Sequence, residues 1–190
     1  MSDYMAGEIW IGGKVPAGLI AELCEVISRQ GLGLEWGDAR FKPSSAADLL
    51  EVREEIDGVP LLHLCNDEAP WGQFDELEGF LQQHRISFRR QSDGKWEYDP
   101  EIVEYRPGSE PIRLLANHAG APVVTVEEFG EIDTQWSQAI NLIEGGSTAR
   151  GIRELKNGLA QFRDLLPKAV PPLEPIEIVE SSATGKPIRG

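Results

Sequence analysis

Cysteine is scarce in this chain, as are long apolar runs. The 190 residues include two cysteines, Cys24 and Cys65, and neither has a second thiol near it in the sequence. Both lie within apolar patterns, so we expect two reduced, buried thiols in a cytoplasmic protein. No apolar run reaches the roughly 18 residues of a membrane span. The opening MSDYMAGE lacks the basic and apolar regions of a secretion signal. We therefore expect neither a membrane span nor a secretion signal.

The motifs of the common enzyme classes are also absent. The sequence contains no GxSxG, HExxH or CxxC pattern. Gly12-Gly13-Lys14 has the spacing of neither a phosphate-binding loop nor a dinucleotide-binding motif. Carboxylates are abundant, but acid–base catalysis also needs surroundings that separate their pKa values. We therefore expect a non-enzymatic protein with no cofactor and no metal.

A group of residues around His63 and Cys65 is the basis of an alternative prediction, an enzyme or a small-ligand sensor. His63 and Cys65 are two positions apart on a predicted strand, so their side chains share a face, and Asp67 follows. With His118 these groups offer the ligands of a metal-dependent enzyme or a small-ligand sensor, although a zinc site would need a second paired motif. A structural histidine and thiol on a buried strand explain the same pattern.

Basic residues are few in comparison with acidic ones. There are 32 Asp and Glu against 18 Lys and Arg, which gives a net charge of −14. From Leu114 to Ala149 there is no Lys or Arg at all. Such a surface repels nucleic acid and anionic membranes and attracts basic partners. Acidity that serves only solubility is the competing explanation.

The order of periodic segments predicts an α+β fold. Apolar patterns indicate strands and helices in the order βαββαβ, the ferredoxin-like α/β sandwich, once the helix predicted at 45–56 is set aside as an insertion. Two further strands, 111–116 and 122–127, extend the sheet. The elements of the sandwich are strands at 8–12, 32–41, 59–65, 86–91 and 95–105 and helices at 16–31 and 73–84.

The C-terminal part of the chain changes in character. Apolar residues at helical spacing predict a helical hairpin within 131–166, packed on the sandwich or forming a small second module. Residues 167–190 are rich in proline and predict a flexible tail. We expect three parts: a sandwich domain over 1–130, the hairpin and the tail. A further possibility is that the hairpin and tail join the chain to a larger assembly.

The stretch SDGKWEYDPE, residues 92–101, predicts a β-hairpin. Asp93-Gly94 is a strong turn signal, and a three-residue loop pairs Phe88 with Tyr98 and Arg90 with Trp96. In this register the carboxylates of the second strand share its outward face. No lysine is interspersed to relieve their repulsion, which is unusual for an exposed strand.

These observations together predict an acidic protein that binds a basic protein or a nucleoprotein complex, without direct contact with nucleic acid or membrane. The most specific version is a nucleic-acid mimic that inhibits a nucleic-acid-handling complex, in the manner of anti-CRISPR or anti-restriction proteins, which this chain resembles in charge and size alone. The predicted partner-binding residues are those of the base-free acidic clusters: Asp67, Glu68, Asp75, Glu76, Glu78, Glu97, Asp99, Glu101, Glu104, Glu127, Glu128 and Glu131.

Overall fold

The computed structural model describes residues 3–95, 98–117, 119–165 and 170–180. The chain divides into two compact units. The first unit comprises residues 1–113 and 170–190, and the second comprises residues 114–169. None of the helices in the described ranges is both long and apolar enough to cross a membrane.

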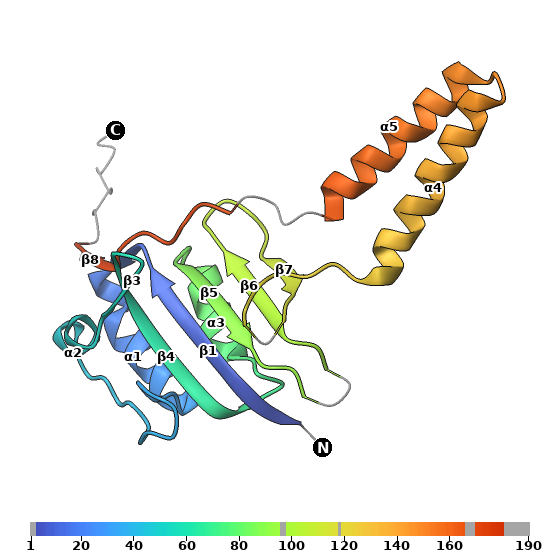
Figure 1. Ribbon diagram of the computed structural model, residues 1–190. Helices are drawn as coiled ribbons and strands as arrows, with labels where there is room; N and C mark the ends of the chain where they lie inside the picture. The colour runs from blue at the N-terminus through green and yellow to red at the C-terminus, as the bar shows by residue number, and fades with distance from the viewer. Residues whose placement is uncertain (1–2, 96–97, 118, 166–169, 181–190) are drawn as a thin grey trace, which may run out of the picture. The chain divides into compact units, whose positions relative to one another are not determined.

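A mostly antiparallel sheet with the strand order β3-β4-β1-β5-β6-β7 forms the frame of the first unit, as Figure 1 shows. The central strand β1 lies between β4 and β5 and is antiparallel to both. Buried and half-buried residues alternate along it, as expected for a strand with two different faces. The strands are β1 (Tyr4–Gly12), β3 (Glu54–Ile56), β4 (Val59–Pro70), β5 (Ser87–Ser92), β6 (Glu101–Tyr105) and β7 (Ile112–Leu115).

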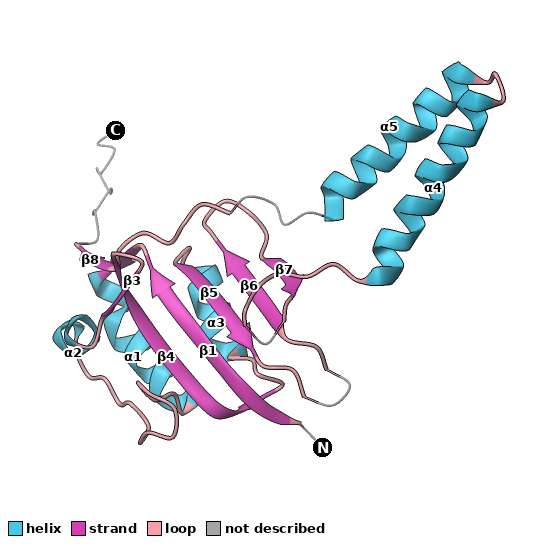
Figure 2. Ribbon diagram, viewed as in Figure 1, coloured by secondary structure: helices cyan, strands magenta, loops and turns pink. Residues whose placement is uncertain are grey.

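Two helices, α1 (Ile20–Gln30) and α3 (Asp75–Gln83), lie on one face of this sheet (Figure 2). A short 3-10 helix, Ala17–Leu19, leads into α1, and Gly31 ends α1 in the left-handed conformation predicted for its C-cap. The helices bury one apolar stripe each against the inward residues of β1, β4 and β5. The α+β class predicted from the sequence is confirmed.

The strand predicted at 32–41 is wrong. Gly33 makes an isolated bridge with Cys65, and the chain then turns through Gly37, which has a positive φ of 78°. The helix predicted at 45–56 is also shorter than expected. Helix α2 is limited to Ala46–Glu51, where Ser45 and Asp48 form the predicted capping box, and β3 follows it. Residues 32–41 form a loop because the chain reverses at Gly37 and the Phe41 N–H donates back to the Leu32 carbonyl over 2.7 Å.

The expectation of a flexible tail does not hold for residues 170–180. Strand β8 (Glu177–Val179) pairs in parallel with β2 (Lys14–Pro16), and the Glu177 N–H donates to the Gly13 carbonyl over 2.9 Å. Ile176 is 1% exposed and belongs to the main hydrophobic core. A Cβ at Gly12 would collide with the backbone carbonyl of Glu174, so this crossing requires glycine at position 12.

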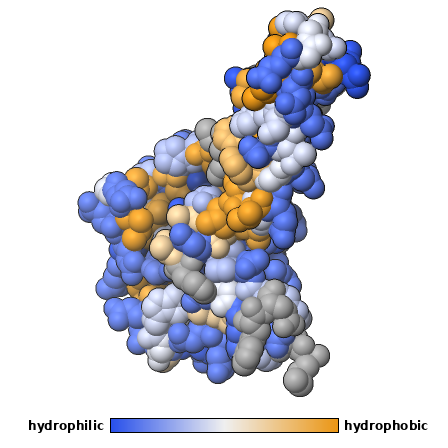
Figure 3. Space-filling view, turned by 45° about the vertical axis from the view of Figure 1, so that its right-hand side comes forward, coloured by the Kyte–Doolittle hydropathy of each residue, from blue (hydrophilic) through white to orange (hydrophobic). Residues whose placement is uncertain are grey.

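The second unit contains a helical hairpin of α4 (Val126–Glu144) and α5 (Thr148–Leu165). Helix α4 begins ahead of the predicted start of the hairpin at residue 131, because Thr125 and Glu128 form a capping box. Gly158 of α5 lies against the indole of Trp136, which leaves no room for a Cβ. Apolar side chains remain exposed on this hairpin, among hydrophilic ones (Figure 3).

Candidate partner-binding surface

The register predicted for the 92–101 hairpin is wrong. Phe88 lies opposite Tyr105 and Ser92 lies opposite Glu101, so β6 begins at Glu101, and the connection before it, of which residues 93–95 and 98–100 are described, is named the 93–100 loop. An aromatic pair does hold the two strands together, with 5.5 Å between the ring centroids of Phe88 and Tyr105. Tyr98 was the wrong partner because the loop closes on itself, through paired hydrogen bonds between Lys95 and Tyr98.

This register gives the predicted row of carboxylates a different role. Glu97 lies outside the described residues, and Asp99 is exposed within the loop. Glu104 is half-buried on β6, opposite Arg89, and its Oε2 lies 3.0 Å from Nη2 of Arg106. Glu101 is held by two arginines, of which Arg113 donates from Nη1 over 3.1 Å. Glu101 and Glu104 therefore form ion pairs within the sheet, and the prediction of a solvated row along one strand is wrong.

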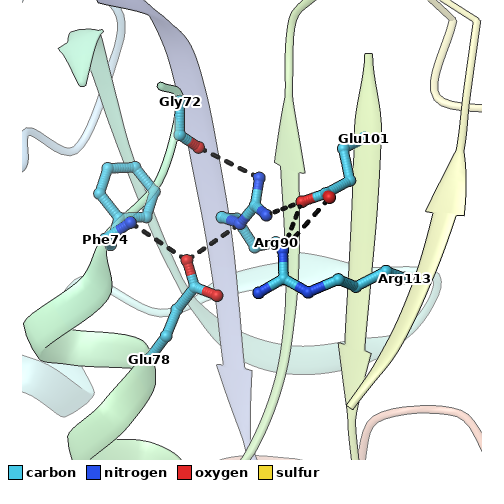
Figure 4. A network of polar contacts seen from close by, with 6 residues as sticks. All are labelled: Gly72, Phe74, Glu78, Arg90, Glu101 and Arg113. Carbon is cyan, nitrogen blue, oxygen red and sulfur yellow. Dashed lines mark hydrogen bonds and ion pairs between the residues drawn. The ribbon is translucent and has the colours of Figure 1, made fainter. Parts of the chain in front are cut away.

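The second arginine that holds Glu101 is Arg90, which is fully buried on β5 (Figure 4). Its Nε lies 2.9 Å from Oε1 of Glu78, and its Nη1 donates to the Gly72 carbonyl over 3.2 Å. Glu78 is almost fully buried and also accepts the Phe74 N–H over 3.1 Å. Burial raises the pKa of Glu78, although the nearby Arg90 charge opposes this shift. Arg90 thus joins the start of α3 to β5 and β6.

Four other predicted residues border the loop between β4 and α3. Asp67 and Glu68 lie near the end of β4, and Asp75 and Glu76 begin α3, where a negative charge interacts favourably with the helix dipole. All four residues are exposed. Asp67 accepts the Gly37 N–H over 2.6 Å, and Glu76 makes an exposed ion pair with Arg29.

Trp71 lies in the middle of this loop, and its ring contacts Tyr98 of the 93–100 loop with 5.0 Å between centroids. The exposed Asp99 is the next residue after Tyr98. We name Asp67, Glu68, Asp75, Glu76 and Asp99 the acidic end of the first unit. Sequence analysis identified these carboxylates but missed Trp71, which no acidic pattern includes.

The remaining predicted residues, Glu127, Glu128 and Glu131, belong to the second unit. All three are exposed on the first turns of α4. Glu128 is part of the capping box, and its hydrogen bonds with Thr125 lower the pKa of its carboxyl group. These residues form a separate acidic group at the start of a helix.

His63, a residue of the alternative site, lies between two carboxylates. Its Nε2 is 3.0 Å from Glu8 and its Nδ1 is 3.0 Å from Glu54. Its ring stacks on Trp10, with centroids 5.1 Å apart and planes at 6°. Both ring nitrogens face acceptors, which suits an imidazolium with two N–H donors. Burial lowers the pKa of His63, but the hydrogen bond to Glu8 and the charge of Glu54 outweigh it and raise the pKa overall.

We expect His63 to titrate above the value of about 6.5 found for a free histidine. Because the folded-state pKa is raised, the stability contributed by His63 is present in full below pH ~6.5 and is lost as pH rises through the folded pKa. An NMR titration of the His63 ring protons gives this pKa directly. The advantage of the native protein over His63→Gln in urea unfolding should shrink over the same range. A midpoint below that of free histidine would contradict the ion-paired geometry.

Cys65, a second residue of the alternative site, is a buried thiol. Burial and the charges of Asp67 and Glu8 raise the pKa of the Cys65 thiol to about 11, which favours the protonated thiol at neutral pH. Both cysteines are free and buried, as predicted. His118 lies outside the described residues. Within the described ranges, no three His, Cys, Asp or Glu side chains form a metal-binding group.

Comparisons with known proteins return no match to a family model, a curated protein or a solved structure.

Proposed function

We propose that this chain is a non-enzymatic binding protein whose acidic end receives a basic surface of a partner protein or nucleoprotein complex. One observation carries the proposal. The buried or half-buried acids Glu78, Glu101 and Glu104 are neutralised by arginines within the sheet. All five carboxylates of the acidic end are instead exposed; Glu76 pairs with Arg29 at the surface, and Asp99 directly follows Tyr98 of the aromatic pair. Exposed carboxylates gathered on one part of the unit can accept the Lys and Arg side chains of a partner.

The specific version of the proposal is a nucleic-acid mimic. Carboxylates at the acidic end would occupy a Lys- and Arg-lined channel meant for phosphates and would release its counter-ions. The partner would then be a nucleic-acid-handling complex of the kind that anti-restriction and anti-CRISPR proteins inhibit. On this proposal the chain itself binds neither nucleic acid nor membrane, because its net charge of −14 repels both.

We also propose a finer assignment for the fold of the first unit. We interpret β1-α1-β3-β4-α3-β5 as the βαββαβ order of the ferredoxin-like sandwich, with β6 and β7 as an extension. In this interpretation the short β3 takes the place that the sequence assigned to residues 32–41. The acidic end then lies where β4 leads into the second helix of the sandwich.

A charge-neutralised variant tests the proposal. The triple variant Glu68→Gln/Asp75→Asn/Glu76→Gln removes three exposed carboxylates and leaves Asp67 on its hydrogen bond to Gly37. If each lost pairing is worth about 0.5 kcal/mol, partner affinity should fall by about tenfold. The partner is captured from lysate of the native cell, eluted over a salt gradient and identified by mass spectrometry. The affinity of each variant is then measured with the purified partner.

A matched control separates position from total charge. Glu22→Gln/Glu51→Gln/Glu55→Gln also removes three exposed carboxylates, so both variants change the net charge from −14 to −11. Glu22 lies in the first turn of α1, as Asp75 and Glu76 do in α3, so the helix-dipole effect is partly matched. The control should keep the native affinity. Equal losses in the two variants would mean that total charge, and not the acidic end, attracts the partner.

A further inference from the structure

A small pocket opens beside the aromatic pair of the acidic end. Its volume is about 190 Å³, and its walls come from β1, the β4–α3 loop and the 93–100 loop with the start of β6. The rings of Trp71 and Tyr98 meet at 75°, so they form a corner. The residues that line the pocket are Met5, Trp71, Gln73, Ser92, Tyr98, Asp99 and Glu101.

The Trp71 wall is held in an unfavourable backbone conformation. Trp71 has a φ of 57°, which is rare for a bulky side chain, and Gly72 follows at 62°. Two hydrogen bonds hold this backbone conformation in place. The Trp71 N–H donates to the Asp3 carbonyl over 2.8 Å, and Arg90 donates to the Gly72 carbonyl. Strained residues of this kind gather at ligand-binding sites, where the surrounding structure pre-positions them.

The Tyr98 wall is fixed in a similar way. Lys95 and Tyr98 exchange backbone hydrogen bonds, and Nζ of Lys95 donates to the Tyr4 carbonyl over 2.9 Å. The 93–100 loop is thereby attached to the first residues of β1. Tyr98 remains 38% exposed, so its ring is accessible from solvent. The pocket is therefore preformed and open.

The charge of the pocket is negative. Glu101 is already paired with Arg90 and Arg113, as Figure 4 shows. Asp99 is exposed, and among the described residues it has no ion-pair partner. Aromatic faces attract cations through their quadrupole, and a free carboxylate beside them adds a charged acceptor. Two aromatic rings beside a carboxylate that is unpaired among the described residues are the groups that recognise a cation.

The size of the pocket limits what it can hold. Drug-sized ligands occupy pockets of roughly 300–1,000 Å³, so 190 Å³ suits one side chain. A planar guanidinium stacks on aromatic rings and pairs with a carboxylate through two N–H groups. We propose that this pocket receives an arginine side chain of the basic partner, with its guanidinium against the Trp71–Tyr98 corner and paired with Asp99. The inference rests on the proposed function and adds an anchor residue to it.

The test uses a defined probe, the acetylated and amidated peptide Gly-Gly-Gly-Arg-Gly-Gly-Gly. Its control replaces arginine by citrulline, which has nearly the same shape and no charge. Binding is followed on ¹⁵N-labelled full-length protein by the indole signal of Trp71 and the amide signals of Tyr98 and Asp99. The arginine peptide should shift these signals in a saturable way, and the citrulline peptide should not.

Paired variants assign the binding to the pocket. Tyr98→Phe keeps the aromatic face and should bind the arginine peptide as the native protein does. Tyr98→Leu keeps apolar bulk without the quadrupole, and Asp99→Asn keeps the shape without the charge, so each should bind about tenfold more weakly. Circular dichroism of each variant checks that it is folded.

The outcomes distinguish the pocket from the proposed function. Absence of shifts, or equal binding by native protein, Tyr98→Leu and Asp99→Asn, would overturn the pocket. If partner affinity nevertheless falls in the Glu68/Asp75/Glu76 variant but not in its matched control, the proposed function stands without the pocket. If the arginine peptide requires Tyr98 and Asp99 while the charge variants leave partner affinity unchanged, the pocket is supported and the proposed function fails.

Discussion

Arg90→Met should destabilise the first unit by about 3–5 kcal/mol, the usual cost of removing one partner from a buried ion pair. The substitution leaves the Glu78 carboxylate buried, with the Phe74 N–H as its remaining partner in the network, and it removes the hydrogen bond to the Gly72 carbonyl. Glu101 is affected less, because it is partly exposed and retains Arg113. Urea unfolding followed by tryptophan fluorescence measures the loss.

Two further variants show whether the loss comes from the buried charge. Arg113→Met removes an arginine from the same carboxylate, Glu101, but this side chain is 56% exposed, so the cost should stay below about 1 kcal/mol. Arg90→Met/Glu78→Leu removes both buried charges and should recover much of the stability, since apolar replacements of buried ion pairs are often tolerated. Equal costs for Arg90→Met and Arg113→Met would contradict the buried network.

Ile176→Ala should cost about 2–4 kcal/mol, although residue 176 lies in a segment whose composition predicts a flexible tail. Ile176 is inside the main core, and its N–H donates to the Pro60 carbonyl over 3.0 Å. Truncation of Ile176 to alanine leaves a cavity in the main core next to the start of β8. The neighbouring side chains only partly fill such a cavity. The same unfolding experiment measures this loss.

The neighbouring Glu177→Ala is the control, because Glu177 is exposed and its removal should change stability by less than about 0.5 kcal/mol. Hydrogen exchange adds a second measurement on the native protein. The amides of Ile176 and Glu177 donate to Pro60 and Gly13, so both should exchange slowly. Fast exchange at both amides, together with a negligible effect of Ile176→Ala, would show that the segment does not stabilise the first unit.

Elements that depend on neighbours in sequence were predicted well. The apolar stripe and Gly31 predicted α1, and the pair Ser45 and Asp48 predicted the start of α2. The continuous apolar run after Gly58 predicted β4. Each of these signals acts within about one helical turn or one strand, so a single sequence contains all of it.

Elements that depend on distant partners were predicted poorly. The 92–101 hairpin has a strong turn signal, but its register depends on Arg90 being buried beneath α3 and on Phe88 meeting Tyr105. Residues 170–180 are rich in proline, with one short apolar stretch at 176–179, and their order depends on Ile176 reaching a core built by other strands. Local patterns do not contain such long-range partners.

Some features of the candidate site likewise follow from the sequence, and others follow only from the fold. The sequence alone determined the excess of acid, its base-free clusters and the lack of common catalytic motifs, because these are properties of composition and order. Only the tertiary structure decided which carboxylates are neutralised by buried arginines, which stay exposed, and that Asp99 lines a pocket with Trp71 and Tyr98. The physical reason is that an ion pair or an aromatic corner requires side chains within a few ångströms of one another, and for residues distant in sequence the fold alone brings them together.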